Sequence, residues 1–233
     1  MAKDHGARQQ KRLAKQKAKR LEKRSILARL SSKDPTIRLQ RAERWPVVES
    51  MAGAKLWKDG IGYLAIARRE AEGRLVFAVF LVDVYCLGVK NAFWQEGESG
   101  DFKDLIQKME TTQPMRPISA ACLVKIVKGA VEYARSFGFP PHPDYRHAAT
   151  LLAGIDTATC TQEFTFGRDG KPFYIQGPHE SPAQARAISE RIAGAGGHYL
   201  FELADPGSPE LADSEDDFDE IDSLDDDSPD ELP

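Results

Sequence analysis

One carboxylate lies where a soluble protein rarely has one. Asp83 falls inside residues 74–84 (RLVFAVFLVDV), a run otherwise composed mainly of β-branched, aromatic and other apolar residues. A buried carboxylate is costly unless a metal, a cation or hydrogen-bond donors surround it. One hypothesis is a metal-binding aspartate at the centre of a sheet, with Glu132, Asp144 or Asp156 as its companion. That outline suits a metal-dependent nuclease or phosphotransfer enzyme.

A structural role for Asp83 is the simpler interpretation, and we favour it. Near the end of its strand, Asp83 is expected to pair with Lys90, Arg135 or a helix N-terminus. The chain contains no G-x-S-x-G sequence and no evident Cys–His pairing, so nucleophilic hydrolysis is not indicated. We therefore expect a protein that is not an enzyme, with the metal-dependent reaction as the alternative.

Residues 138–145 (GFPPHPDY) form an unusually constrained segment. Its three prolines fix the backbone around His142 and Tyr145, which would suit a preorganised binding or catalytic loop and makes His142 and Asp144 weak catalytic candidates. An ordinary connector between helices is the favoured alternative. His142 and His147 are five residues apart and do not share a helix face, so we expect no metal and no cofactor.

The strongest sign of binding chemistry is the distribution of charge. Residues 1–44 hold fifteen Lys or Arg and four Asp or Glu, a net charge of +11, whereas residues 45–201 hold seventeen of each. Cations in an arm that lacks an apolar stripe neutralise phosphates without reading sequence. We predict that this arm, disordered or partly helical alone, binds RNA or a ribonucleoprotein. The predicted nucleic-acid-binding residues are Arg8, Lys11, Arg12, Lys15, Lys17, Lys19, Arg20, Lys23 and Arg24.

The C-terminal segment has the opposite charge. Residues 202–233 hold fifteen Asp or Glu and no Lys or Arg. Two interpretations stay open: a disordered solvating tail, or a segment that masks the basic arm. The tail also makes a basic protein a possible partner. The sequence thus divides into a basic arm (1–44), a globular domain (45–203) and an acidic disordered tail (204–233).

The cysteines and the apolar runs bear on where the protein works. Cys86, Cys122 and Cys160 are odd in number and far apart, so we expect reduced thiols rather than a disulfide. No apolar run is long enough to span a bilayer, and the basic N-terminus lacks the apolar core of a secretory signal. These features predict a cytoplasmic protein that does not contact membranes.

The elements that must position these residues follow from periodicity and turn signals. Strands are expected at 47–50, 60–69, 74–84, 163–166, 172–176 and 198–203, with hairpins joining 60–69 to 74–84 and 163–166 to 172–176. Helices are expected at 36–44, 101–110, 119–137, 144–153 and 181–193. Grouped strands and grouped helices indicate a single α+β domain, with a mainly antiparallel sheet of about five strands packed by about four helices.

Three runs carry a resemblance. FLVDVYCLGVKN (80–91), GFPPHPDY (138–145) and FGRDGKPFYIQGP (166–178) are similar to a family of uncharacterised bacterial proteins. The resemblance implies a bacterial cytoplasmic origin and one self-contained domain. It implies no activity, cofactor or site residue. The leading hypothesis is therefore a non-enzymatic RNA- or ribosome-associated protein, and the alternatives are the metal-dependent enzyme and a protein-interaction module.

Overall fold

The computed structural model describes residues 35–71, 73–178 and 180–201. The predicted nucleic-acid-binding residues between positions 8 and 24, and the acidic tail, lie outside these ranges. The described chain is an α+β fold built on an antiparallel sheet, as the grouping of strands and helices predicted.

The main sheet has five strands in the order β4-β3-β2-β1-β5, and every neighbouring pair is antiparallel. The strands are β1 (Val47–Gly53), β2 (Ile61–Arg69), β3 (Leu75–Asp83), β4 (Gly88–Gly97) and β5 (Met115–Pro117). The predicted hairpin is confirmed, because β2 pairs with β3 along its whole length, from Ile61 opposite Asp83 to Arg69 opposite Leu75.

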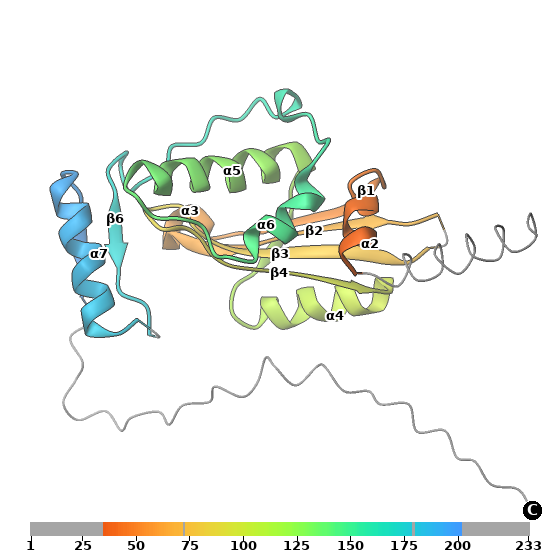
Figure 1. Ribbon diagram of the computed structural model, residues 1–233, viewed down its shortest axis with the longest axis horizontal. Helices are drawn as coiled ribbons and strands as arrows, with labels where there is room; N and C mark the ends of the chain where they lie inside the picture. The colour runs from red at the N-terminus through yellow and green to blue at the C-terminus, as the bar shows by residue number, and fades with distance from the viewer. Residues whose placement is uncertain (1–34, 72, 179, 202–233) are drawn as a thin grey trace, which may run out of the picture. The chain divides into compact units, whose positions relative to one another are not determined.

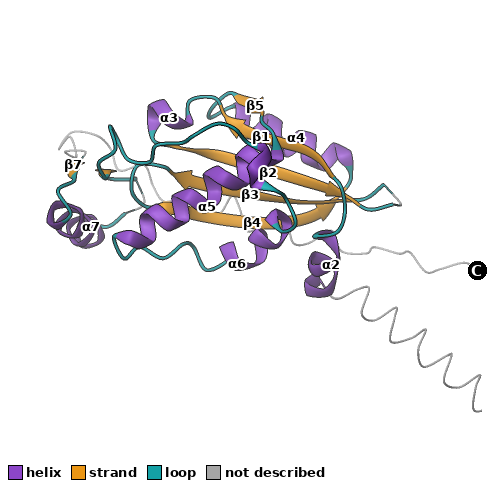
Figure 2. Ribbon diagram, turned by 90° about the horizontal axis from the view of Figure 1, so that it is seen from above, coloured by secondary structure: helices purple, strands orange, loops and turns teal. Residues whose placement is uncertain are grey.

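Helices cover both faces of the sheet (Figures 1 and 2), with α5 (Ala120–Ser136) on one face and α4 (Ser99–Glu110) on the other. Alternate residues of β3 enter two separate cores: Ala78 and Phe80 pack with α5, whereas Phe77 and Val79 pack with α4. This explains why the strand is apolar on both faces. Among the described helices, none is long and apolar enough to cross a bilayer.

Helix α5 is the longest described helix, and its sequence predicted it well. The Ser119 hydroxyl accepts a hydrogen bond from the Cys122 amide at the N-terminus, as an N-cap serine does. Its apolar residues at helical spacing are all buried, among them Leu123, Val127 and Ala134. Gly138, with φ of 80°, follows the C-terminal end of the helix.

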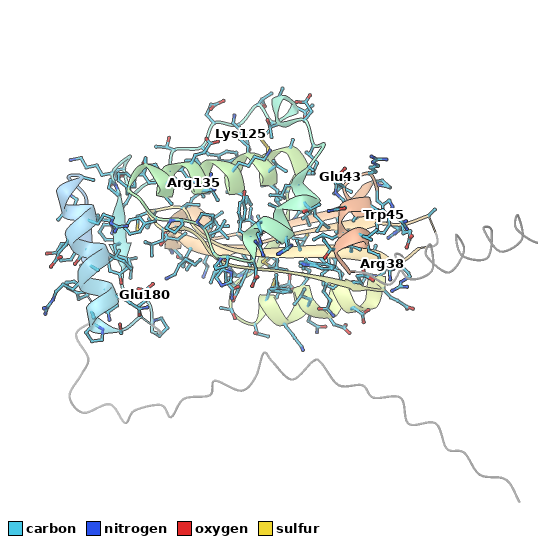
Figure 3. All side chains as sticks on the ribbon, viewed as in Figure 1. Arg38, Glu43, Trp45, Lys125, Arg135 and Glu180 are labelled. Atoms are coloured by element: carbon cyan, nitrogen blue, oxygen red, sulfur yellow. A yellow bond between two sulfur atoms is a disulfide. The ribbon has the colours of Figure 1, made fainter. Side chains whose placement is uncertain are left out.

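The described fold begins earlier than the change in composition indicated. Helix α2 (Pro35–Ala42) buries Leu39 and Ala42 in the same core as the apolar residues of α5, although residues 1–44 were expected to form the arm. Its Arg38 guanidinium lies 2.7 Å from the Glu96 carboxylate (Figure 3), so this cation is engaged within the fold. The last part of the basic segment therefore belongs to the folded domain.

The last part of the described chain, residues 145–200, differs from the prediction at one point. Helix α6 (Tyr145–Ala148) and the 3₁₀ helices η1 (Ala149–Leu152) and η2 (Thr157–Thr159) lead to β6 (Phe173–Ile175), α7 (Pro182–Gly194) and β7 (His198–Leu200). The expected second hairpin is wrong, because β6 pairs in parallel with β7 and residues 163–166 form no strand. The turn itself is present, with an isolated antiparallel bridge between Arg168 and Lys171.

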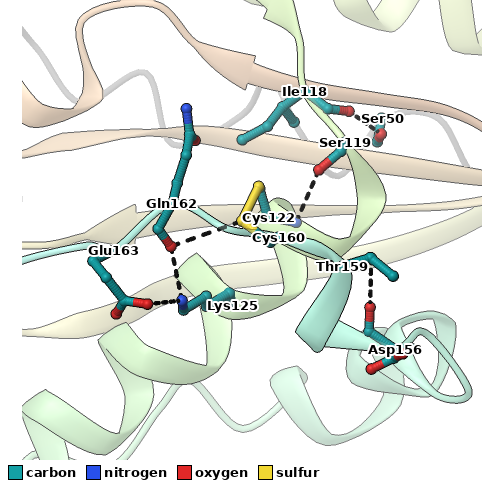
Figure 4. The surroundings of a disulfide bond; sticks show 10 residues. All are labelled: Ser50, Ile118, Ser119, Cys122, Lys125, Asp156, Thr159, Cys160, Gln162 and Glu163. Atoms are coloured by element: carbon teal, nitrogen blue, oxygen red, sulfur yellow. Dashed lines mark hydrogen bonds and ion pairs between the residues drawn. A yellow bond between two sulfur atoms is a disulfide. The ribbon is translucent and has the colours of Figure 1, made fainter.

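The prediction of three reduced cysteines is also wrong in this structure. Cys122 and Cys160 form a disulfide across 38 residues, with their Cα atoms 5.1 Å apart, and Cys86 is free and buried. Figure 4 shows the bond joining the start of α5 to the segment that follows η2. Sequence spacing held no sign of the pair, because only the packing of η2 against α5 brings the two cysteines together.

Candidate functional site

Asp83 has a structural role in the turn after β3. One carboxylate oxygen accepts hydrogen bonds from the Tyr85 and Cys86 amides, each at 2.8 Å. Burial raises the pKa of Asp83 to about 6, while these amides and the charge of Lys90 act in the opposite direction. The carboxylate therefore has a structural role in the β3–β4 turn, but its partners are backbone amides of that turn rather than the expected Lys90, Arg135 or helix N-terminus, and the Lys90 ammonium pairs with Glu180 instead.

The other residues of the enzyme hypothesis lie in separate places. Glu132 is exposed on α5, and Asp156 accepts a hydrogen bond from the Ala158 amide at the start of η2. His142 and Asp144 lie together before α6, where the His142 Nδ1 is 3.8 Å from the Asp144 carboxylate. Among the described residues, no group of three or more His, Cys, Asp or Glu side chains could hold a metal. We therefore do not propose the metal-dependent nuclease.

A half-buried polar cluster joins the segment between β6 and α7 to the main sheet. The Lys90 ammonium on β4 lies 2.6 Å from one oxygen of the Glu180 carboxylate. The other oxygen accepts hydrogen bonds from the Tyr174 hydroxyl at 2.5 Å and from the Gly177 amide at 2.9 Å. Burial raises the pKa of Glu180, but these three hydrogen bonds outweigh it and the net shift is downward. The ion pair therefore links β4 to the segment between β6 and α7, where Figure 3 labels Glu180.

A second candidate site is a groove between α3 (Leu56–Asp59) and residues 162–170. Two cavities of about 430 and 570 Å³ adjoin there and share Trp57 and Thr165 in their walls. These volumes are typical of small-ligand pockets, which span about 300–1,000 Å³. Trp57 is 37 % exposed, whereas its neighbour Leu56 is buried in the core. We call this feature the Trp57 groove.

Contacts on several sides hold Trp57 in place. Its ring stacks on Phe164 at 5.5 Å with an interplanar angle of 4°, and Phe166 lies 5.6 Å away at a tilt. The Tyr85 hydroxyl is 3.1 Å from the Trp57 carbonyl oxygen and fixes the turn of α3. A side chain at Gly60, where φ is 80°, would overlap the Tyr85 ring. The groove is therefore largely preformed.

The charged residues of the larger cavity leave a surplus of one cation. Lys58, Arg168 and Asp169 line the larger cavity. Glu163 lines the smaller one, and its carboxylate lies 2.7 Å from the Lys125 ammonium, a pair drawn in Figure 4. The Arg168 guanidinium lies over the Phe173 ring, 4.7 Å from its centre, which restrains its orientation.

Sequence reasoning did not single out the Trp57 groove. One tryptophan in a four-residue helix gives no periodic signal, and Phe164 and Phe166 were assigned to a strand that does not form. The available signal was the glycine-rich, charged turn at residues 167–170. No protein-family model, curated protein or solved structure matches the chain.

Proposed function

We propose that the protein is a non-enzymatic RNA- or ribonucleoprotein-binding protein that uses its basic N-terminal segment for electrostatic affinity. The observation that carries this proposal is the separation of charge: residues 1–44 carry a net +11, whereas residues 45–201 are neutral. A polyanion would therefore be attracted to one end of the chain rather than to the whole molecule.

The described part of the basic segment supports this arrangement. Leu39 and Ala42 fasten α2 to the core, while Arg41 and Arg44 remain exposed on the same short segment. Arg38 is engaged with Glu96 and Glu70, so we assign it to the fold rather than to a ligand. The cationic residues before position 35 are thus joined to the domain through an anchored helix.

The test compares the full chain with a variant in which the nine predicted arm residues between positions 8 and 24 are replaced by glutamine. RNA binding is measured by fluorescence anisotropy at two salt concentrations. If six to ten cations contact phosphate, the affinity of the wild type falls by about 10³–10⁵ between 50 and 200 mM salt, and the variant shows a much smaller dependence. Wild-type binding that does not respond to salt would contradict the proposal.

The acidic tail is tested in the same assay. Deletion of residues 204–233 removes most of the fifteen carboxylates that follow residue 201. A rise in RNA affinity at low salt would identify the tail as a segment that masks the arm, whereas unchanged affinity would identify a solvating tail.

One observation favours a protein-interaction role as the second candidate function. Ile175 on β6 and Leu200 on β7 are 45 % and 55 % exposed, and they lie opposite each other in the small parallel sheet. Exposed apolar residues grouped in this way are typical of contact surfaces. Replacement of Leu200 by lysine, followed by sedimentation velocity of the full chain, tests self-association. A wild-type protein that stays monomeric at all concentrations would contradict self-association through this surface.

A further inference from the structure

We propose that the Trp57 groove binds an unpaired nucleotide of single-stranded RNA, with the base stacked on the indole ring and the adjoining phosphate held by Lys58 and Arg168. This inference rests on the proposed function and deepens it. It assigns to the folded domain a contact that differs in kind from the electrostatic contact of the arm.

The aromatic wall of the groove carries the first step. Trp57 borders both cavities. The Phe164 ring stacks against it beside the smaller one, and Tyr85 is a second aromatic residue in the wall of the larger one. Sequence-tolerant binding of single strands uses aromatic side chains of this kind, because every base has a flat face to stack. Phe164 and the Tyr85 hydroxyl already restrain Trp57. Binding would therefore cost little further loss of conformational entropy at this residue.

The cations of the larger cavity carry the second step. Lys58 and Arg168 line the same cavity as Trp57, and Asp169 is the carboxylate among them. Glu163, in the neighbouring cavity, is engaged by Lys125. The planar guanidinium of an arginine can form two parallel hydrogen bonds to a phosphate. The Arg168 guanidinium lies over the Phe173 ring, which restrains its orientation. A base with its phosphate therefore fits both the aromatic and the charged residues of this cavity.

The composition of the groove favours a nucleotide over a protein side chain. The larger cavity is lined by Trp57, Lys58, Tyr85, Thr165, Gly167, Arg168, Asp169 and Gly170, with no aliphatic side chain beyond threonine. The centres of protein interfaces are depleted in charged residues, whereas charged residues make up three of these eight positions. A double helix would present its phosphates but not an unstacked base, so we infer a single strand.

The experiment measures binding of the full chain to a fluorescein-labelled single-stranded RNA and to a duplex RNA of the same length. We expect Trp57→Ala to weaken binding of the single strand about 5- to 150-fold, the range contributed by one base–aromatic stack. Binding of the duplex should not change, because that contact is made by the arm. Trp57→Phe keeps an aromatic ring and should retain most of the affinity.

A charge variant tests the phosphate contact without touching Trp57. The double variant Lys58→Gln/Arg168→Gln should lower the salt slope for the single strand by about 0.7, the value expected when one phosphate is no longer neutralised. Its matched control is Lys103→Gln/Lys108→Gln, which removes two exposed cations from α4 on the other face of the sheet and should leave the slope unchanged.

The outcomes separate the two proposals. If the wild type binds both RNAs with strong salt dependence but Trp57→Ala binds the single strand as tightly as the wild type, the groove inference is overturned and the role of the arm stands. If the wild type binds neither RNA, the proposed function fails. Melting curves of Trp57→Ala and of the charge variant establish that each is folded. If Trp57→Ala does not fold, an unchanged salt slope in the charge variant overturns the groove inference by itself.

Discussion

Replacement of Arg68 by methionine should destabilise the protein more than any surface substitution in this part of the chain. Arg68 is 4 % exposed on β2, and its guanidinium donates to four carbonyl oxygens. Nε lies 2.8 Å from the Leu151 oxygen, and Nη1 lies 2.6 Å from the Glu43 oxygen and 2.8 Å from the Trp45 oxygen. The fourth bond joins Nη2 to the Ala153 oxygen. One side chain thus ties the end of α2 and the end of η1 to the sheet.

The expected magnitude follows from those four carbonyl groups. Methionine keeps much of the apolar stem but offers no donor. Burial lowers the pKa of Arg68, against a smaller opposite effect of Glu43, so part of the gain from four bonds already offsets desolvation of the charge. If water reaches two of the four oxygens, the other two remain unsatisfied at about 1.5–2 kcal/mol each. We therefore expect a loss of about 3–4 kcal/mol and a Tm lower by about 6–16 °C.

Arg69→Met is the matched control, because Arg69 is the next residue on the same strand and is exposed. Urea unfolding of the wild type and both variants, followed by circular dichroism, gives the free energies of unfolding. We expect the Arg69 variant to stay within about 0.5 kcal/mol of the wild type. A loss for Arg68→Met within about 1 kcal/mol of the control would refute the account of Arg68 as the link between α2, η1 and the sheet.

Three further predictions concern single features of the core. Because burial raises the pKa of Asp83 from 3.8 to about 6, its contribution to stability is fully present below about pH 4 and is lost as the pH rises through 6. Relative to Asp83→Asn, the wild type should therefore lose about 1–3 kcal/mol between about pH 4 and 7 in urea unfolding, and a constant difference would contradict this. Reduction of the Cys122–Cys160 disulfide, which closes a 38-residue separation, should lower the free energy of unfolding by about 2–4 kcal/mol. Thermal melts with and without dithiothreitol measure this, and equal melts would argue against the bond. Gly129→Ala places a Cβ about 2.6 Å from the Phe166 ring and should change the near-ultraviolet circular dichroism of the aromatic residues. The better helix propensity of alanine, about 1 kcal/mol, should offset the strain, so a large loss of stability would show that Phe166 cannot move.

The elements that the sequence predicted well depend on local signals. The hairpin of β2 and β3 follows from two apolar runs and a short polar join, all within residues 61–83. Helix α7 follows from Ser181 as its N-cap and Pro182 at its first position, and in the structure Ser181 and Gln184 form a capping box there. In each case the contacting residues belong to one continuous stretch of the chain, so a local pattern is enough to find them.

The second hairpin failed because distant contacts outweigh its local pattern. The Asp-Gly turn is present, with φ of 55° at Asp169 and 78° at Gly170. The expected strands on either side instead pack elsewhere: Phe166 lies over Gly129 of α5, and Tyr174 is fully buried beside Glu180. Aromatic side chains that suit a strand also suit a core, and only the three-dimensional arrangement decides between the two.

The same reasoning separates Asp83 from Trp57. Asp83 attracted attention because a carboxylate in an apolar run breaks a local rule, yet its partners are the amides two and three residues later. Trp57 breaks no rule, and its stacking partner Phe164 comes more than a hundred residues later. A buried charge can therefore be recognised in the sequence even when its role is structural. A cluster of exposed aromatic side chains can be recognised only in the folded structure, where distant segments meet. In a chain whose charges point to a polyanion, the contacts that would give selectivity should be sought at the second kind of site.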